Sequence, residues 1–464
     1  MIARMRLCVA PLAAALVTAA VLAAPASAAT ARAAAAVRAK LPNGLTVIVQ
    51  PSPRLPVVSF RLVSRAGSVQ DPAGKEGLAR MTAELLTQGA GTRTAQQVAE
   101  DIEFVGGSLE ASSRTEQFTV SCDVLKKDLA TGLGLFHDVV VKPTFSAEEF
   151  ARKQEEALGT IASNRSEPSV IAEQAFSSYL WGDSPLAHPA IGTEKSVKAL
   201  ARDDVASFHR RFVAPDRSLL VIAGDVEPAA ILAQVRKAFA DWKPSGEPVR
   251  DPYAAPAPVA ARGIRVVDKP EATQAQIRMG CIAVPRNHPD YDAIQVANTI
   301  LGDGFTSRLV NAIRVEKGLT YSISSGFTQH RGAGAFRVST FTRNAKLREC
   351  VDATLAEIGK LANEGPTQAE LDKARNYLVG QYPLELQAAS DLAAQIATVE
   401  FYGLPQDWIA KYNDRVRAVT MADVKRVLGA YFCSDKLRIV VVTQGDVAKQ
   451  ALDGLGPVEV RPID

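Results

Sequence analysis

The sequence predicts an α+β fold built from two homologous domains, each a mostly antiparallel sheet packed with helices. Three observations predict it. Expected strands and helices come in blocks and do not alternate strictly, which is typical of α+β layers. A proline-rich stretch divides the 464-residue chain, which is too long for a single hydrophobic core. The parts on either side of that stretch then repeat one order of elements.

Residues 1–28 are typical of a secretory signal peptide. Arg4 and Arg6 lead a run of small and apolar residues that ends in an Ala26-Ser27-Ala28 cleavage site. The alternative is a permanent membrane anchor, but Pro11 and Pro25 interrupt the apolar run. No other stretch approaches the ~20 apolar residues that a membrane span needs. We therefore expect an exported, periplasmic protein that keeps no membrane anchor after cleavage.

Residues 38–242 are expected to form the N-terminal domain. Apolar runs rich in β-branched residues predict strands, and runs with helical spacing predict helices. Expected strands cover residues 45–49, 57–63, 109–113, 118–124 and 219–222. Expected helices cover residues 77–88, 94–105, 129–140, 147–164, 170–180 and 204–212. Thr94 and Gln97 stand at capping-box spacing, which predicts the start of the second helix.

Residues 243–262 are expected to form an extended linker. This stretch contains five prolines together with Ser, Gly and Ala, a composition that favours a connector over packed structure. The C-terminal domain then covers residues 263–464. It is expected to end as the first domain does, with a helix through Phe432 and a strand over residues 437–442.

Two short phrases recur at a nearly constant offset. Gly-Asp-Val at residues 224–226 and 445–447 follows the last expected strand of each domain, 221 positions apart (445 minus 224). Ala-Glu at 147–148 and 369–370 opens a helix behind an expected Pro-Thr or Thr cap, 222 positions apart (369 minus 147). The alternative is that both domains merely share a common secondary-structure pattern. Matching order at a matching offset favours an internal duplication.

Composition excludes two classes of function. The net charge of +3 gives no basic surface of the kind that nucleic acid requires. The four cysteines that follow the signal peptide, Cys122, Cys281, Cys350 and Cys433, include no CxxC pair, which argues against a thiolate metal site. Spacing alone does not decide whether any two of them form a disulfide.

The stretch from Leu301 to Phe327 carries the candidate chemistry. It is expected to form a turn at residues 302–304, a helix from about Ser307 to Gly318, and a strand that Tyr321 opens. Arg314 and Tyr321 then flank one helix-to-strand corner, where two donors can hold a carbonyl oxygen or the oxyanion that it becomes. The alternative is structural: Arg314 neutralises the helix C-terminus, and Tyr321 is a half-buried strand aromatic.

The phrase LGDGFTSRLVNAIRVEKGLTYS at residues 301–322, the duplication and the order of elements closely resemble the insulinase and pitrilysin family of zinc metallopeptidases. This family includes the mitochondrial processing peptidase. The resemblance covers the whole chain after the signal peptide and implies that each chain is half of a clam shell that closes around a peptide. It also implies an inverted His-x-x-Glu-His zinc motif after a phrase like Gly74-Lys75-Glu76-Gly77-Leu78-Ala79.

At the zinc-motif positions this chain departs from the family. Arg80, Ala83 and Glu84 stand where the family has its first histidine, catalytic glutamate and second histidine. The third ligand should fall near Gly159 or Thr160, and neither has a carboxylate. Zinc needs imidazole or carboxylate ligands and its bound water needs a base, so we expect no metal in this chain. Arg80 and Glu84 are instead expected to pair across the helix at i, i+4.

The five histidines offer no substitute site. His137, His188, His209, His288 and His330 are isolated in the sequence, with no two at ligand spacing. We therefore expect each to be a surface or core histidine and not a metal ligand.

The resemblance implies a role for the second domain. Family members use an arginine and a tyrosine seven positions apart at this corner, and Arg314 and Tyr321 match them. In bacterial two-chain members one chain carries the zinc and its partner carries this pair. The resemblance therefore implies a non-catalytic subunit of a heterodimeric peptidase, with zinc in a homologous partner, peptides as substrates and Arg314 and Tyr321 on the substrate carbonyl.

Two other functions stay open. The chain can be a catalytically inert peptide-binding or scaffold subunit. It can also be an independent hydrolase, although it has no Gly-x-Ser-x-Gly nucleophile elbow and its Ser112-Ser113 and Ser324-Ser325 pairs fall at strand positions.

Overall fold

A computed structural model describes residues 35–463 apart from 248–252, 254–256, 258 and 434. The predicted signal peptide lies outside the described residues, as does much of the predicted linker. Of the linker residues that are described, Tyr253 donates its hydroxyl to Glu116 at 2.5 Å, and Val259 packs beside buried residues of both halves. The exact domain boundaries stay a prediction.

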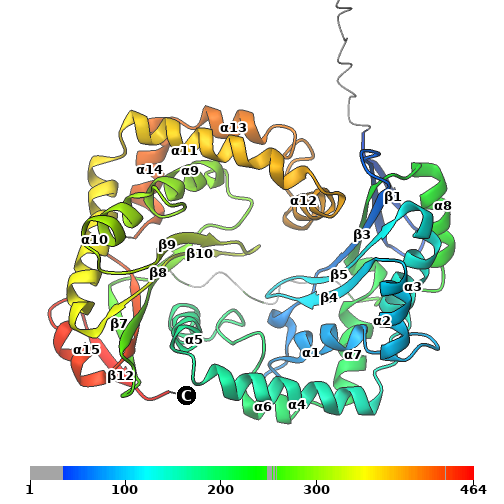
Figure 1. The fold of residues 1–464 in the computed structure, drawn as a ribbon, viewed down its shortest axis with the longest axis horizontal. Helices are drawn as coiled ribbons and strands as arrows, with labels where there is room; N and C mark the ends of the chain where they lie inside the picture. Colours follow the sequence, from blue (N-terminus) through cyan, green and yellow to red (C-terminus); the bar gives the residue numbers. More distant parts are fainter. Residues whose placement is uncertain (1–34, 248–252, 254–256, 258, 434, 464) are drawn as a thin grey trace, which may run out of the picture. The chain divides into compact units, whose positions relative to one another are not determined.

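Within the described residues, six strands form the first sheet, in the order β1-β2-β6-β3-β5-β4 (Figure 1). The strands are β1 (Val37–Lys40), β2 (Thr46–Pro51), β3 (Val57–Ser64), β4 (Ser108–Ser113), β5 (Phe118–Leu125) and β6 (Ser218–Gly224). Strand β3 lies at the centre, antiparallel to β5 on one side and to β6 on the other, while β2 runs parallel to β6. The predicted strands match these bounds to within one or two residues.

The second sheet repeats the first, in the order β12-β7-β11-β8-β10-β9. Its strands are β7 (Gly263–Asp268), β8 (Gln274–Ala283), β9 (Ile323–Thr328), β10 (Gly334–Arg343), β11 (Arg438–Thr443) and β12 (Val458–Arg461). Strand β8 is antiparallel to β10 and β11, and β7 is parallel to β11, as in the first sheet. The edges beyond β2 and β7 differ, because β1 is antiparallel and β12 parallel to its neighbour. The prediction of two homologous, mostly antiparallel α+β halves is confirmed.

The helices predicted for the first half are all present, whereas most helices of the second half were not predicted. In the first half they are α1 (Leu78–Leu86), α2 (Ala95–Phe104), α3 (Leu129–Val141), α4 (Ala147–Asn164), α5 (Pro168–Trp181), α6 (Glu194–Lys198), α7 (Arg202–Phe212) and α8 (Pro228–Ala238). In the second half they are α9 (Tyr291–Leu301), the π-helix η4 (Val310–Glu316), α10 (Leu347–Glu364), α11 (Gln368–Gln381), α12 (Ala389–Tyr402), α13 (Tyr412–Ala418), α14 (Met421–Tyr431) and α15 (Gly445–Ala451). Short 3-10 turns join them: η1 (Ser68–Gln70), η2 (Lys126–Asp128), η3 (Pro215–Arg217), η5 (Asn344–Lys346) and η6 (Tyr382–Leu386).

Capping residues set the helix starts. The predicted capping box of α2 is present, with Thr94 accepting from the Gln97 backbone and Gln97 from the Thr94 backbone. Thr367 forms a second capping box with Glu370 at α11. The cap of α4 is Ser146 and not the Pro-Thr pair before it, because the Ser146 hydroxyl is the group that accepts the N–H of Glu149.

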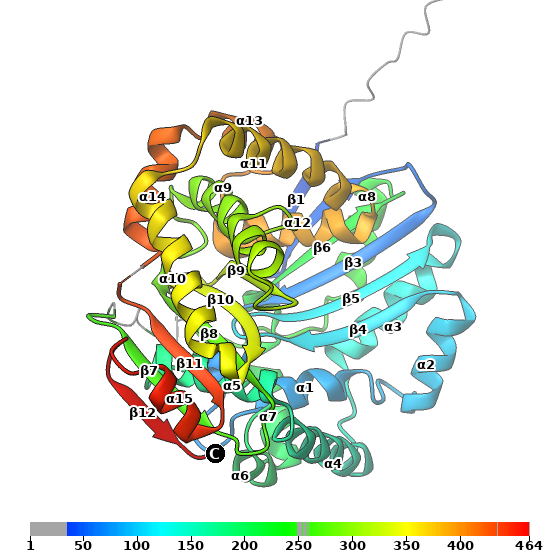
Figure 2. The same cartoon turned by 60° about the vertical axis from the view of Figure 1, so that its left-hand side comes forward.

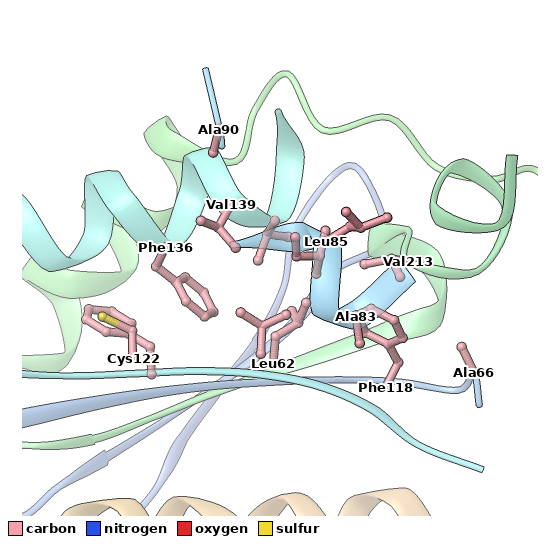
Figure 3. Packing of buried hydrophobic residues seen from close by; sticks show 14 of the residues in the cluster. Leu62, Ala66, Ala83, Leu85, Ala90, Phe118, Cys122, Phe136, Val139 and Val213 are labelled. Carbon is pink, nitrogen blue, oxygen red and sulfur yellow. The ribbon is translucent and has the colours of Figure 1, made fainter. Parts of the chain in front are cut away.

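The core of the first half lies between one face of its sheet and helices α1, α3 and α7. Figure 3 shows Leu62 and Phe118 of the sheet facing Phe136 of α3 and Leu85 of α1. Phe60 stacks on Phe136 with ring centroids 5.6 Å apart, and both are fully buried. An equivalent core surrounds Phe336 and Phe432 in the second half.

The other face of each sheet is covered by a helix from the opposite half (Figures 1 and 2). Helix α12 packs on β3 and β6, and α5 packs on β8 and β11. Small residues let α12 approach the first sheet closely, since Ala393 and Ala397 of this helix are buried against Val63 and Val221. The two halves are therefore joined by a reciprocal exchange of helices as well as by the linker.

Cys281 of β8 and Cys433, just after α14, form a disulfide, with their Cα atoms 6.4 Å apart. Cys122 and Cys350 are free and buried, and burial raises the pKa of Cys350 to about 11. These observations decide a question that spacing left open. Over the part of the chain that the structure describes, no helix combines the length and apolarity needed to cross a membrane.

The difference in burial between two phenylalanines predicts a difference in the stability of their alanine variants. Replacing Phe136, which is fully buried, by alanine should lower the free energy of unfolding by about 3–5 kcal/mol, because the cavity adds to the lost burial. Phe104 at the end of α2 is 92% exposed, so Phe104→Ala should change it by less than about 0.5 kcal/mol. Urea unfolding of both variants measures the difference, and equal effects would contradict the placement of these rings.

Candidate functional site

Helix α1 carries the zinc-motif positions, and its start is held firmly. Asp71 accepts the backbone N–H groups of Gly77 and Ala79, each at 2.8 Å, and so caps the helix. Gly77 has a φ of 101°, and a Cβ there would lie 2.6 Å from the carbonyl oxygen of Ile191. The close contact with the loop before α6 therefore explains Gly77, whereas Gly74 has a φ of 80° and no neighbour within 4 Å of a Cβ placed there.

The side chains at the zinc-motif positions do not fit a metal. Arg80 donates its Nε–H to Glu84 at 2.6 Å, which confirms the predicted pair. Ala83 is buried in the core beside Leu62 and Phe118 (Figure 3). A guanidinium has no lone pair to offer and a methyl group has no donor atom, so one carboxylate is left, and it is already paired.

The other predicted positions add no ligands. Gly159 and Thr160 lie in α4, where the Thr160 hydroxyl bonds to the carbonyl of Glu156 at 2.9 Å. Among the residues that the structure describes, no group of three or more His, Cys, Asp or Glu side chains is placed to hold a metal ion. His209 is a core histidine: its Nε2 bonds to the carbonyl oxygen of Val140, and burial lowers its pKa to about 4.

The second candidate region is the corner between η4 and β9. Leu309, Val310 and Ile313 are buried, and Gly318 ends the helix, as predicted, with a φ of 58°. The segment is a π-helix and not the expected α-helix, and the N–H of Leu319 closes it by donating to the carbonyl of Ile313 at 3.0 Å. Wide turns of this kind are frequent at functional sites.

The prediction that Tyr321 opens the strand is wrong, because β9 begins at Ile323. Threonine hydroxyls hold the backbone around Tyr321 instead. The Thr342 hydroxyl donates to the carbonyl of Leu319 at 2.7 Å, and Thr320 and Thr340 both donate to the carbonyl of Ser322 at 2.9 Å. The main chain at Tyr321 is thus fixed by side chains of β10 and by its own neighbour.

The side chains of Arg314 and Tyr321 meet, as predicted, but they meet face on. The guanidinium carbon of Arg314 lies 5.0 Å from the ring centroid of Tyr321 and 5.8 Å from that of Phe305. Tyr321 is 76% exposed and Phe305 is 82% exposed. Within the described residues, neither Arg314 nor Tyr321 makes a side-chain hydrogen bond or ion pair, so their donors face solvent.

Sequence reasoning missed two residues of this corner. Phe305 forms the second aromatic neighbour of Arg314, and an aromatic residue inside an otherwise polar turn was the available signal. Arg308 donates two hydrogen bonds of 2.7 and 2.9 Å to the carboxylate of Glu370 in α11. These bonds fix the segment just before η4 to α11. No local pattern indicates that long-range pair.

Comparison with known proteins identifies the fold and the family. The model for the insulinase family, peptidase family M16, matches residues 46–194, and the model for the peptidase M16 inactive domain matches residues 199–378. The chain belongs to the M16 peptidase family. An uncharacterised zinc protease of Mycobacterium leprae is 28% identical over 367 residues, which is 79% of this chain and 82% of that protein. One of Streptomyces coelicolor is 28% identical over 397 residues, 84% of this chain and 86% of the relative.

Solved M16 structures share this architecture. A peptidase M16 inactive domain from Pseudomonas fluorescens has a TM-score of 0.83 at 27% identity, covering 88% of this chain and 98% of that one. A protease from Helicobacter pylori has a TM-score of 0.82 at 20% identity, covering 88% and 99%. The predicted two-domain family fold is therefore confirmed, and the inactive-domain matches support a non-catalytic M16 chain.

The ion pair between Arg308 and Glu370 predicts how the stability of the chain depends on pH. The guanidinium of Arg308 lowers the pKa of Glu370 from 4.5 to about 2 in the folded chain. A lowered pKa contributes stability that is present above pH 4.5 and is lost as the pH falls toward 2. The difference in unfolding free energy between wild type and Glu370→Gln should therefore shrink over that range. Glu148→Gln, at an exposed position of α4, is the control, and an equal pH trend there would contradict the assignment.

The zinc-motif positions make a prediction about metal content. The purified chain, equilibrated with excess zinc and then desalted, should retain well below one zinc per chain, because Arg80 and Ala83 offer no ligand atom. Elemental analysis by mass spectrometry measures this ratio. A Glu84→Ala variant should give the same value, whereas stoichiometric zinc that this substitution removes would overturn the reading of α1.

Proposed function

We propose that this chain is the zinc-lacking subunit of a heteromeric M16 metallopeptidase. It supplies Arg314 and Tyr321 to bind the substrate carbonyl while a homologous partner subunit, in a heterodimer, holds the zinc. The chain itself is exported to the periplasm, and its substrates are peptides.

The observation that carries the proposal is the contrast between two sets of donors. Arg80 is tied to Glu84 on α1, whereas the half-buried Arg314 and the exposed Tyr321 have no hydrogen-bond partner within the described part of the chain. A structural arginine at a helix end would be expected to use its donors on nearby carbonyls or carboxylates. Free donors at a rigid corner suit a ligand that arrives from outside.

The geometry of the corner suits a carbonyl oxygen. A guanidinium stacked on a ring keeps its N–H groups in its own plane, and the neighbouring phenol adds an O–H. Donors of this kind stabilise the negative charge that grows on a peptide carbonyl during attack by water. The fixed main chain at Thr320 and Ser322 supports this use, because such donors work best when they are already in place.

Relatives with zinc-protease names support a peptidase complex as the setting. They align with most of this chain, yet Arg80, Ala83 and Glu84 leave it without a metal site of its own. The zinc, and the water that it activates, would then belong to a second M16 chain with an intact His-x-x-Glu-His motif.

The proposal predicts the effect of removing one donor. With a zinc-bearing M16 partner present, Tyr321→Phe should lower kcat for peptide cleavage by about 10²- to 10³-fold, because the carbonyl loses one of its donors in the transition state. Association of the two chains should be unchanged in analytical ultracentrifugation. Tyr377→Phe removes the same atom from a partly exposed tyrosine of α11 and is the matched control.

Two outcomes would overturn the proposal in different ways. If Tyr321→Phe and wild type support equal turnover in an assembled pair, the chain is a scaffold or peptide-holding subunit. If the chain alone cleaves peptides and keeps zinc, the division of labour between two chains is wrong.

A further inference from the structure

A buried pair of polar residues joins α9 to β9, the strand that follows Tyr321. Asn298 of α9 is 7% exposed, and Ser325 of β9 is 8% exposed. The Ser325 hydroxyl donates to Oδ1 of Asn298 at 2.7 Å, and Nδ2 of Asn298 donates to the carbonyl oxygen of Ser325 at 3.2 Å. Both polar atoms of the Asn298 amide are therefore paired with one residue of β9.

The turn that follows α9 is tied to the same residue of β9. The backbone N–H of Ser325 donates to the carbonyl oxygen of Gly302 at 3.1 Å. A Cβ at Gly302 would lie 2.4 Å from Oγ of Ser325 and 2.7 Å from its backbone nitrogen, so any side chain there would displace the serine. We call Asn298, Gly302 and Ser325 the Asn298 lock.

The lock joins the two segments that carry the aromatic neighbours of Arg314. Phe305 stands in the chain just after the turn, and Tyr321 stands just before β9. The guanidinium carbon of Arg314 lies 5.8 Å from the ring centroid of Phe305 and 5.0 Å from that of Tyr321. The hydroxyls of Thr340 and Thr342 tie the main chain around Tyr321 to β10, whereas the lock ties β9 to the turn. The spacing of the two rings therefore depends on the lock.

Hydrogen bonds suit this task better than apolar contacts do. They are directional, so a paired buried network fixes the positions of its members. A buried amide destabilises a core unless it is paired, and the Asn298 amide uses both of its polar atoms on Ser325. Exact placement matters at a catalytic corner, because a displacement of about 1 Å can lower a rate by about 10²-fold.

We propose that Asn298 is a positioning residue for Arg314. Through Ser325 and Gly302 it sets the distance between Phe305 and the segment of Tyr321, and the two rings in turn orient the guanidinium. Asn298 itself touches no substrate. The inference rests on the proposed role of Arg314 and Tyr321 at the substrate carbonyl, and it adds the part of the fold that holds them ready.

The first test measures peptide cleavage by the mature chain together with its zinc-bearing M16 partner. Ser325→Ala removes the hydroxyl that Asn298 accepts, and it should lower kcat by about tenfold or more while KM stays close to that of wild type. Ser64→Ala is the matched control, because Ser64 is a fully buried strand serine of the first half whose hydroxyl lies 2.6 Å from that of Ser218. This control should keep the wild-type kcat.

The second test needs no partner and follows Tyr321 directly. In the chain labelled with 3-fluorotyrosine, the ¹⁹F resonance of Tyr321 is the one that Tyr321→Phe removes. It should move in Ser325→Ala and stay in place in Ser64→Ala, since a loss of stability alone does not change the surroundings of the ring in the folded chain. If Ser325→Ala fails to fold, Asn298→Asp replaces it in both tests, because it keeps the size of the side chain and removes the Nδ2 donor.

The outcomes separate this inference from the proposed function. Wild-type kcat or an unmoved Tyr321 resonance in Ser325→Ala, together with slow cleavage by Tyr321→Phe, would overturn the positioning role and leave the proposed function standing. Wild-type turnover in Tyr321→Phe would overturn the proposed function, and the positioning role with it. A lower kcat and a moved resonance in Ser325→Ala, with neither in Ser64→Ala, would support the role of Asn298.

Discussion

The exchange of helices between the two sheets is the constraint on which the rest of this structure depends. Each sheet buries one face against its own helices and the other against a helix from the opposite half, α12 on the first sheet and α5 on the second. A sheet buried on both faces needs apolar residues on both, which is why strands such as β6 read as nearly continuous apolar runs. Because neither half can cover its own sheet, the duplicated halves must fold as one unit, and α1 and the η4 corner are both held on that common frame.

This constraint also explains how α1 survives without its metal. Apart from Arg80 and Glu84, all of its residues are buried, including Ala83 at the position of the family's catalytic glutamate. The helix is therefore specified by its packing and by the Asp71 cap, not by ligands. A partly exposed i, i+4 pair such as Arg80 and Glu84 contributes only about 0.3–0.5 kcal/mol. Side chains that cannot bind zinc at these positions therefore need little compensation in the fold.

Local sequence patterns predicted the elements well and the tertiary details poorly. The predicted run of residues 147–164 matches both ends of α4, although its cap is Ser146 and not the expected Pro-Thr pair. Tyr321 was misplaced because the start of β9 is set by hydroxyls of Thr340 and Thr342, which lie about twenty residues away in sequence. The Cys281–Cys433 disulfide and the Arg308–Glu370 ion pair also join residues that are far apart in the sequence, so local patterns do not indicate them. The expected elements placed Arg314 and Tyr321 at one corner, and the family resemblance added the expectation that the pair binds a substrate carbonyl.

Surroundings, and not residue type, decide what each arginine can do. Arg80 and Arg308 give their donors to carboxylates and so are confined to structural work. Arg314 is held by the faces of Tyr321 and Phe305, and a stacking contact orients a guanidinium without using any of its N–H groups. Stacking thus positions the donors and leaves them free at the same time, which an ion pair cannot do. The same reasoning applies to Arg286 between Tyr291 and Trp408, where burial makes the unused donors more costly.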